Sequence, residues 1–588
     1  MTDRFSFNLA DEAWLPFIGT DGKPGTASLR DALTQAHLIR DLVVDAPTQY
    51  PALIRLLLAV LHRSLGRSKG TQVGTYPPNQ KGWALWLKAA LPPADLIDDY
   101  LGHWRGRFDL FDAHEPFFQA AGLTTGKGTP QGRTVGLLVP FVSSGNNAPI
   151  FSSARDDAPA PLTPGQAARW LVHAHAWDTA GIKTGARGDP EATGGKVYRN
   201  PTGPLGALGV VVLTGATLWE TLALNLVYQE GWPDADLPVW EREPLTAAWE
   251  ERPATGLLDL YTWPGRRIRL LPDALDGATR VRRVLVCAGD RLRHERLHTL
   301  EPHTAWRANA APAKTARKKE KKKEQKPADG RRTDDPDGGD ATDLYRPIRH
   351  LPGEQLWRGL GGILGVAEGK ASGQRGMLPP RQVARLNAVR GLPPDKIIRV
   401  HASGIAYGNQ NAVIDETYDD VLPLPVAVLR SEGHPVLAET ALDAVDRTKN
   451  AAWTLGRLAS DVAFVSGADE PTQKSRGTKA HERLYAALDQ PFRAWVQTLT
   501  DDDLADELAA DWQRRAANTV QRIADELLHH APPGAHRTRW RPGKKPSTKD
   551  PVNAALAERE FRRRLRRHLP LAFPPETAPP PHGNGDSA

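Results

Sequence analysis

The clearest catalytic pattern in the sequence is His294-Glu-Arg-Leu-His298. On a helix the two histidines would lie one turn apart and share a zinc ion, and Glu295 would act as the general base of a hydrolase. Arginines crowd this segment, and their positive charge opposes the binding of a divalent cation. A zinc-dependent hydrolase is therefore one hypothesis that the sequence leaves open.

Other residues that could do chemistry form weaker patterns. His173 and His175, with Asp178 nearby, fall in a segment of helical character, where residues two apart point to different faces. Cys287 ends the apolar run Val-Leu-Val-Cys, which predicts an inert thiol in the core. The sequence contains no phosphate-binding loop of the form GxxxxGK(S/T) and no G-x-S-x-G nucleophile elbow between a predicted strand and a predicted helix.

Two further patterns suit binding rather than catalysis. Residues 179–188 are rich in small side chains, which let a backbone approach a ligand closely, and Lys183 and Arg187 add positive charge. Gln410 and Asn411 stand at the tip of an expected hairpin. Taken alone, each pattern is also explained by ordinary structure, as a flexible basic loop and as a polar turn.

The positive charge of the chain is unevenly distributed. The formal net charge is +7 and the pI is about 9.3. Residues 314–326 hold eight basic and two acidic residues, a net +6, so the remainder of the chain is near +1 (7 − 6). Positive charge attracts phosphates only where it is clustered, as in 537–545 and 559–567 near the C-terminus.

The composition excludes several classes of protein. A single cysteine rules out an internal disulfide and a cysteine-rich zinc module. The first residues lack the pattern of a signal peptide, and no apolar stretch is long enough to span a bilayer. We therefore expect a cytoplasmic, soluble protein with no membrane contact and no cofactor.

Hydrophobic periodicity and turn residues predict the helices and strands that position these residues. Ser28 predicts the start of a short helix, and Asp21-Gly22 predicts a hairpin turn. Helices are expected at 51–65 and 164–176, a strand at 281–288, and a hairpin from 396–407 and 412–418. The stretch 122–209 otherwise predicts loops, and four amphipathic segments follow Pro435.

These elements predict an α+β protein in which a mixed α/β, loop-rich N-terminal body precedes an α-helical four-helix bundle. The body is expected to span 1–430 and the bundle 431–570. Within the body, the lysine-rich stretch 307–342 cannot bury a core and is expected to be a disordered loop. The proline-rich residues 571–588 predict a disordered tail.

Several segments, taken in order, resemble the CasA family, the large subunit of the type I-E CRISPR surveillance complex Cascade. The resemblance covers nearly the whole chain outside the lysine-rich insertion. It rests on the order of the motifs more than on any one of them. The matching segments are 7–16 (FNLADEAWLP), 28–33 (SLRDAL), 56–63 (LLLAVLHR), 107–111 (RFDLF), 116–119 (PFFQ), 144–148 (SGNNA), 181–188 (GIKTGARG), 406–412 (AYGNQNA) and the terminal bundle.

The resemblance implies a function without intrinsic catalysis. Members of this family sit near the 5′ handle of the guide RNA and inspect double-stranded DNA for a short protospacer-adjacent motif. Base pairing with the guide then identifies the longer target sequence. The implied partners are the other Cascade subunits, the CRISPR RNA, double-stranded target DNA and a helicase–nuclease effector.

The resemblance also assigns residues to the DNA contact. A glycine loop, with the basic residues after it, maps to Thr179, Ala180, Gly181, Lys183 and Arg187. A wedge that parts the base pairs maps to Gln410, Asn411 and Ala412, and the alignment is compatible with either Gln410 or Asn411 in the foremost position. The minor-groove lysine of the family has no clear counterpart, and the nearest basic residues are Arg291, Arg293 and Arg296.

Two further surfaces complete the expectation. The loop that docks the subunit onto the guide-bearing end maps to Asn146, Asn147, Ile150 and Phe151. The last helix of the bundle carries Arg562, Arg563, Arg566 and Arg567, which either follow DNA phosphates or form a solvated outer face. A nucleic-acid scaffold without sequence preference is the remaining alternative.

Overall fold

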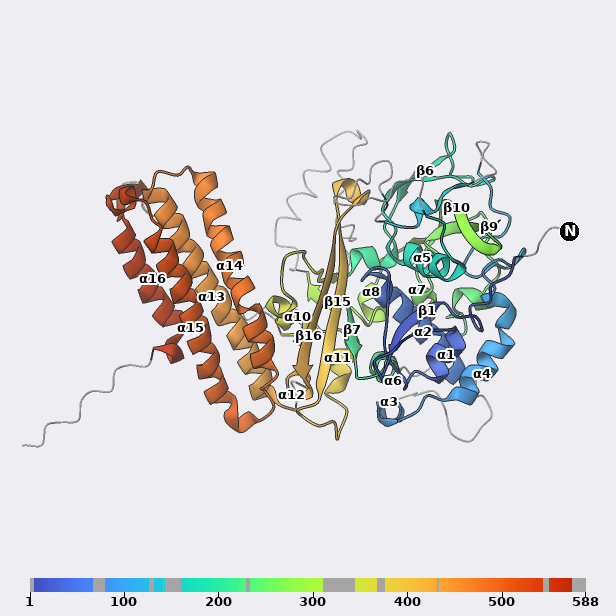
Figure 1. The fold of residues 1–588 in the computed structure, drawn as a ribbon, viewed down its shortest axis with the longest axis horizontal. Helices are drawn as coiled ribbons and strands as arrows, with labels where there is room; N and C mark the ends of the chain where they lie inside the picture. The colour runs from blue at the N-terminus through green and yellow to red at the C-terminus, as the bar shows by residue number, and fades with distance from the viewer. Residues whose placement is uncertain are drawn as a thin grey trace, which may run out of the picture. The chain divides into compact units, whose positions relative to one another are not determined.

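The computed structural model describes residues 5–66, 80–125, 132–140, 142, 160–228, 233–309, 344–366, 376–430, 433–542 and 549–573. The chain divides into two compact units. The first unit is Met1–Gly391 with Ile398–Leu422, and the second is Leu392–Ile397 with Pro423–Ala588. Figure 1 shows the first unit as a mixture of helices and strands and the second as a helical bundle.

A buried helix, α2 (Gln49–Gly66), lies at the centre of the helical part of the first unit. Apolar residues occur all around it, so almost every side chain is buried. It packs against five other helices of the unit. The helices of this unit besides α2 are α1 (Leu29–Thr34), α3 (Gln80–Lys88), α4 (Ala94–His103), α5 (Pro164–Trp177), α6 (Leu218–Asn225), α7 (Leu257–Tyr261), α8 (Leu297–Leu300), α10 (Leu360–Leu364) and α11 (Arg381–Leu386).

The strands of the first unit form several small sheets. In one, β1 (Leu15–Gly19) lies between β2 (Pro24–Ala27) and β3 (Ile39–Leu42). In another, β12 (Trp306–Ala308) lies between β13 (Tyr345–Pro347) and β14 (Met377–Leu378). A two-stranded parallel pair joins β8 (Glu251–Arg252) to β11 (Arg291–Leu292).

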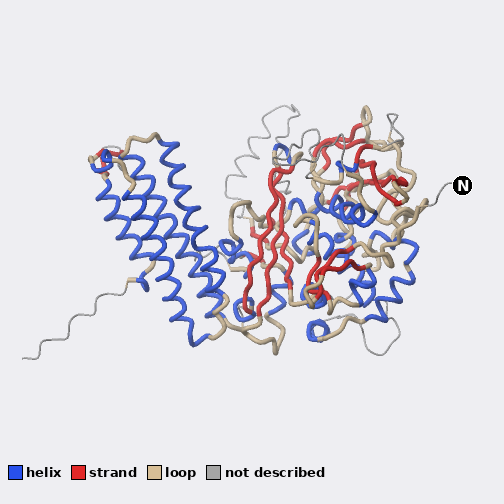
Figure 2. The backbone as a smooth tube through the Cα atoms, in the orientation of Figure 1, coloured by secondary structure: helices blue, strands red, loops and turns tan. Residues whose placement is uncertain are grey.

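Two sheets of the first unit position the candidate site. The first contains β4 (Arg133–Thr134), β5 (Gly181–Thr184), β6 (Lys196–Asn200), β9 (Arg266–Leu275) and β10 (Ala278–Ala288), with β5 parallel to β10 and antiparallel to β6. The second is the long hairpin of β15 (Ile397–Tyr407) and β16 (Ile414–Pro425), in which β15 also pairs with β7 (Val210–Thr214). Figure 2 shows this hairpin as two long strands.

The second unit is a four-helix bundle. Its helices are α13 (Pro435–Val465), α14 (Glu470–Val496), α15 (Ala505–His529) and α16 (Ala554–His568), and α13 packs against each of the other three. The short helix α12 (Val426–Leu429) precedes them, and a small hairpin of β17 (Arg539–Pro542) and β18 (Lys549–Val552) lies between α15 and α16. Phe492, Trp495 and Trp512 pack ring against ring in its core.

The fold class is confirmed, and so are several local predictions. Ser28 caps α1 in a capping box with Asp31, and the hairpin at 396–418 is present. Its second strand runs on to Pro425, beyond the predicted end at 418. The loop-rich interpretation of 122–209 was wrong for β5 and β6, which are strands. Their sequence pattern is weak because their mutual pairing is short and bulged, and because the strand beside them, β10, is distant in sequence.

The predicted disordered segments fall mostly outside the described residues. Arg307 and Ala308, at the start of the 307–342 segment, belong to β12, and 310–342 lie outside. Of the tail, Leu571 and Ala572 end a 3-10 turn, and 574–588 lie outside. Within the described ranges, no helix has both the length and the apolar character needed to cross a bilayer.

Buried histidines predict that acid destabilises the first unit. Burial lowers the pKa of His62, His173 and His175 to about 3, and that of His350 to about 4, from 6.5. The unfolded chain takes up protons at these positions below pH 6.5, whereas the folded chain does not. Their contribution to stability is therefore present above pH 6.5 and is lost as the pH falls toward 4, by about 1.4 kcal/mol per histidine and pH unit.

We therefore expect the melting temperature of the chain to fall steadily between pH 6.5 and pH 4.5 in a thermal unfolding series. The control variant is His103→Gln, which replaces an exposed histidine and leaves the four buried ones in place. A melting temperature independent of pH over this range would contradict the prediction.

Candidate nucleic-acid interface

The glycine loop and the hairpin tip, assigned from separate parts of the sequence, meet in the structure. The Ala180 N–H donates a hydrogen bond of 2.9 Å to the carbonyl oxygen of Asn411. Gly181 has φ +105°, and a Cβ built on it would lie 3.6 Å from the Cβ of Ala412. The end of α5 and the tip of the β15–β16 hairpin therefore form one surface.

The hairpin tip has an unusual backbone conformation. Gln410 and Asn411 have φ +53° and +54°, in the left-handed region that non-glycine residues rarely adopt. The turn is closed by hydrogen bonds from Gly408 N–H to Val413 O (3.0 Å) and from Asn411 N–H to Gly408 O (2.8 Å). The Gln410 side chain is exposed and that of Asn411 is half-buried, so the glutamine projects further from the tip.

A largely buried ion cluster holds the loop in place. The carboxylate of Asp178, at the end of α5, lies 2.7 Å from Lys183 Nζ and 2.5 Å from Arg266 Nε. Burial would raise the pKa of Asp178, but Lys183 and Arg266 hold it below its ordinary value. Arg266 also donates to the carbonyl of Thr179 (2.8 Å), and Lys183 donates to the Thr179 hydroxyl (3.2 Å).

Lys183 therefore points inward in this structure. Its side chain is only 13% exposed, and burial lowers its pKa against the opposing effect of Asp178. This geometry makes Lys183 a positioning residue for the loop, and its direct contact with DNA stays a prediction. Arg187 is exposed beyond the end of β5, where its N–H donates to Thr124 O (2.8 Å).

A second bond ties the hairpin to α5. The hydroxyl of Tyr407 donates to the carbonyl of Trp177 at 2.6 Å, and burial raises the pKa of this tyrosine. Trp177 is the last residue of α5 and Tyr407 is the last residue of β15, so this bond holds the start of the hairpin turn against the helix. The bond between Ala180 and Asn411 holds the turn itself. Sequence reasoning missed Arg266 and Tyr407, because neither stands in a binding pattern.

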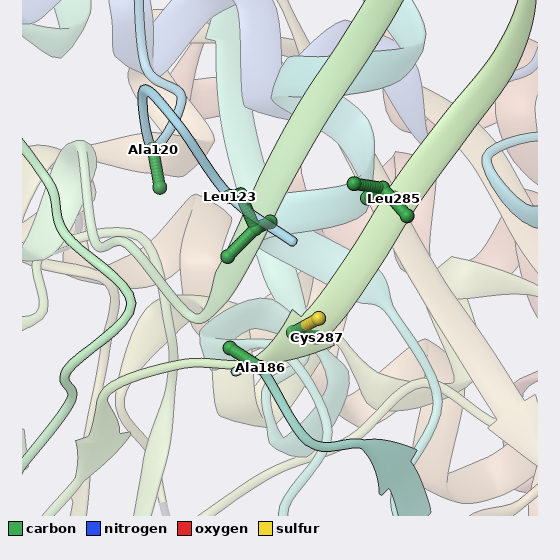
Figure 3. Packing of buried hydrophobic residues seen from close by; sticks show 5 residues of the cluster. All are labelled: Ala120, Leu123, Ala186, Leu285 and Cys287. Atoms are coloured by element: carbon green, nitrogen blue, oxygen red, sulfur yellow. The ribbon is translucent and has the colours of Figure 1, made fainter. Parts of the chain in front are cut away.

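A small hydrophobic cluster packs against the segment that follows β5. Ala186, which follows β5, packs with Cys287, Leu285, Leu123 and Ala120 (Figure 3). Cys287 is buried in β10, as predicted, and burial raises the pKa of its thiol to about 12. The thiol therefore stays protonated and serves as packing.

The three arginines proposed for the minor groove have different surroundings. Arg291 donates to the carbonyl of Tyr198 (2.7 Å), and its guanidinium lies 4.3 Å from the ring centroid of Trp249. Arg291 thus anchors β6, beside the glycine loop. Arg293 and Arg296 are exposed, and no observation places them at the hairpin tip, so their role stays a prediction.

The geometry around the histidines supports neither of the two metal-site hypotheses. His294 precedes α8, and Arg296 between the two histidines has φ +56°, so the predicted helical frame from His294 to His298 is wrong. His173 bonds to the Thr48 hydroxyl (2.8 Å) and His175 to the Phe118 carbonyl (2.9 Å), each inside the core. Across the described residues, no three His, Cys, Asp or Glu side chains are grouped to hold a metal ion.

The arginines of α16 divide into two kinds. Arg562 and Arg563 form ion pairs of 2.7 Å with Glu558 and Glu560 on the same helix. Arg566 and Arg567 are exposed, and neither pairs with a carboxylate among the described residues. The docking-loop residues Asn146, Asn147, Ile150 and Phe151 lie outside the described residues.

Comparison with known proteins identifies relatives along most of the chain. Residues 8–523 match the family described as "CRISPR-associated protein Cse1". The curated CasA/Cse1 protein of Thermus thermophilus is 34% identical over 277 residues, which is 45% of this chain and 49% of that protein. The match thus spans about half the length of this curated relative.

Solved structures extend the likeness to nearly all of the chain. The crystal structure of Thermobifida fusca Cse1 is 35% identical, covers 97% of this chain and 100% of its own, and superposes with a TM-score of 0.80. A chain of a "CRISPR RNA-guided surveillance complex" is 19% identical, covers 89% of this chain and 99% of its own, and has a TM-score of 0.62. The likeness to the latter concerns the fold alone.

The backbone of Gly181 provides a test of the interface geometry. Gly181→Ala should destabilise the protein by about 1–3 kcal/mol, because φ +105° strains an L-residue although the added methyl meets only an ordinary contact. Chemical denaturation measures the change. Gly102→Ala is the matched control, since Gly102 lies in α4 with open space around it, and this change should be neutral or stabilising. Equal effects of the two changes would contradict the strained geometry.

Proposed function

This chain belongs to the Cse1 family of CRISPR-associated proteins, and we propose that it is the large subunit of a type I-E Cascade complex. In this role it recognises the protospacer-adjacent motif in double-stranded DNA and helps to open the duplex for pairing with the guide RNA. The observation that carries the proposal is the hydrogen bond between Ala180 and Asn411, which unites the glycine loop and the amide-tipped hairpin.

The surface formed by the glycine loop and the hairpin tip has properties that suit the recognition and opening of duplex DNA. Small residues at 179–181 allow the backbone to come close to a groove, where amide groups contact base edges. The exposed Gln410 stands on a closed turn, and its position is fixed by the backbone beneath it. Parting a base step costs a few kcal/mol, which a rigid wedge and nearby backbone contacts can offset.

The partners follow from the same proposal. A guide RNA and the other subunits of the complex would hold the target strand, and a separate helicase–nuclease would cut the DNA. The family membership and the fold shared with a chain of a surveillance complex support this assignment. We propose no catalytic step for this chain, and the broken His294–His298 frame removes the geometric basis of a zinc hydrolase.

A scaffold without sequence preference is the second candidate, favoured by the exposed arginines of α16. The two functions differ in what the hairpin tip does. A motif reader needs the tip amides only on duplexes that carry the motif, whereas a scaffold loses affinity for all duplexes alike.

Replacing the tip amides tests the leading proposal. Gln410→Gly and Asn411→Gly remove the side chains while glycine accepts the positive φ, so the turn keeps its shape. We expect the assembled complex carrying Gln410→Gly to lose about tenfold or more in affinity for a motif-bearing duplex, because a wedge contact contributes on the order of 1–3 kcal/mol. Binding to a duplex with a scrambled motif should change little.

Asn411→Ala is the comparison variant, because alanine also strains the backbone. A loss with Asn411→Ala but not with Asn411→Gly would assign the effect to backbone strain. Equal losses on motif-bearing and scrambled duplexes for Gln410→Gly would instead support the scaffold and contradict motif recognition.

The paired arginines of α16 and those without a partner among the described carboxylates provide a matched test of contacts with DNA phosphates. Arg567→Gln should lower the slope of log affinity against log salt concentration by about 1, as expected for one lost phosphate contact. Arg563→Gln should lower it less, because Arg563 is already paired with Glu560. Titrations of the complex at several salt concentrations measure both slopes. Unchanged slopes for both variants would assign α16 to a solvated outer face.

A further inference from the structure

Two large apolar side chains are exposed beside the glycine loop. Ile182 of β5 is 57% exposed and Tyr198 of β6 is 51% exposed. Neither belongs to the residues assigned above. Scattered exposed apolar side chains are ordinary, whereas those that cluster on one surface mark a candidate binding site.

The strand register places both side chains on one face. Thr184 is opposite Lys196 and Lys183 is opposite Val197, and a bulge follows between Lys183 and Gly181. Since side chains alternate along a strand, Ile182 and Tyr198 share the outer face with Thr184 and Lys196. All four are exposed, whereas Val197 is buried. We call these four residues the β5–β6 face.

The β5–β6 face is held firmly. Arg291 bonds to the Tyr198 carbonyl, and the Asn200 amide donates to Gly181 O (3.0 Å) and Val197 O (2.8 Å). Arg199 has φ +60°, a strained conformation that such anchoring maintains. Of the six non-glycine residues with positive φ among those described, Arg199, Gln410 and Asn411 all lie in this region.

The face continues the surface of the proposed motif reader. β5 begins at Gly181, which lies against Ala412 of the hairpin tip. The exposed cation Lys196 pairs with Thr184 on this face, and the exposed Arg187 follows three residues after Thr184, beyond the end of β5. An apolar strip with cations beside it matches the backbone of DNA, in which apolar deoxyribose faces alternate with phosphates.

We propose that the β5–β6 face packs on deoxyribose sugars of the duplex beside the motif and discriminates against ribose. The inference rests on the proposed function. A 2′-hydroxyl placed against the aliphatic side chain of Ile182 loses its water and receives no hydrogen bond from that side chain, whereas the deoxyribose methylene packs there freely. Lys196 and Arg187 contact the adjacent phosphates.

The test compares duplexes that differ in one sugar at a time. Each carries the motif, and single ribonucleotides are moved through the flanking positions so that the duplex stays B-form overall. The wild-type complex should bind at least one of these duplexes roughly tenfold more weakly than the all-DNA duplex, as expected for one unpaired buried hydroxyl. Ile182→Ser should weaken binding to the all-DNA duplex and bring the two affinities close together.

Three controls separate the explanations. Tyr198→Phe should bind as the wild type and Tyr198→Ser should not, if the ring packs on a sugar. Leu85→Ser, at an exposed leucine of α3, should have no effect. Wild-type affinity and an unchanged ribose penalty in Ile182→Ser would overturn the inference, as would loss of nuclease recruitment with DNA binding intact, which would assign the face to a protein partner.

The motif-scrambled duplex distinguishes failure of the inference from failure of the proposed function. If the wild-type complex binds it as well as the motif-bearing duplex, motif recognition itself fails. If motif preference is intact but the sugar at each flanking position makes no difference, only the role of the β5–β6 face is overturned.

Discussion

The candidate interface depends on two hydrogen bonds that hold the tip of a long hairpin against the end of a helix. The Ala180 N–H bonds to the Asn411 carbonyl, and the Tyr407 hydroxyl bonds to the Trp177 carbonyl. They join segments that lie far apart in the sequence, so neither segment alone has the geometry of a reader. Both bonds involve main-chain carbonyls, which fixes the backbone and leaves the side chains of the tip available for a ligand.

The surrounding structure maintains a conformation that the isolated loops would not adopt. Asp178, Lys183 and Arg266 form a largely buried cluster beside the glycine loop, in which Asp178 is paired with both cations. Positive φ angles at Gln410, Asn411 and Arg199 store strain close to the proposed DNA contact. Rigid placement of this kind lowers the entropy lost when the surface meets a duplex, and it is consistent with a wedge that must part stacked bases.

Much of the fold was predictable from local patterns. The four amphipathic segments predicted the bundle, and the Ser28 cap predicted α1. The polar residues between two β-like runs predicted the hairpin. β5 and β6 were not predictable, because each is short, their mutual pairing is bulged, and β10 beside them comes from far along the chain. The resemblance to a family assigned the glycine loop and the tip. The supporting roles of Arg266, Tyr407 and Arg291 required coordinates, since buried bonds to carbonyl oxygens leave no spacing pattern in a sequence.

The central claim is that the loop at 179–181 and the hairpin tip together part a DNA duplex next to a short motif. Fluorescence of 2-aminopurine placed in the first base pair beside the motif measures this directly, because the probe brightens when its stacking is lost. The account predicts a rise when the assembled complex binds the motif-bearing duplex and no rise with a scrambled motif. Tight binding to the motif-bearing duplex without any rise would contradict it.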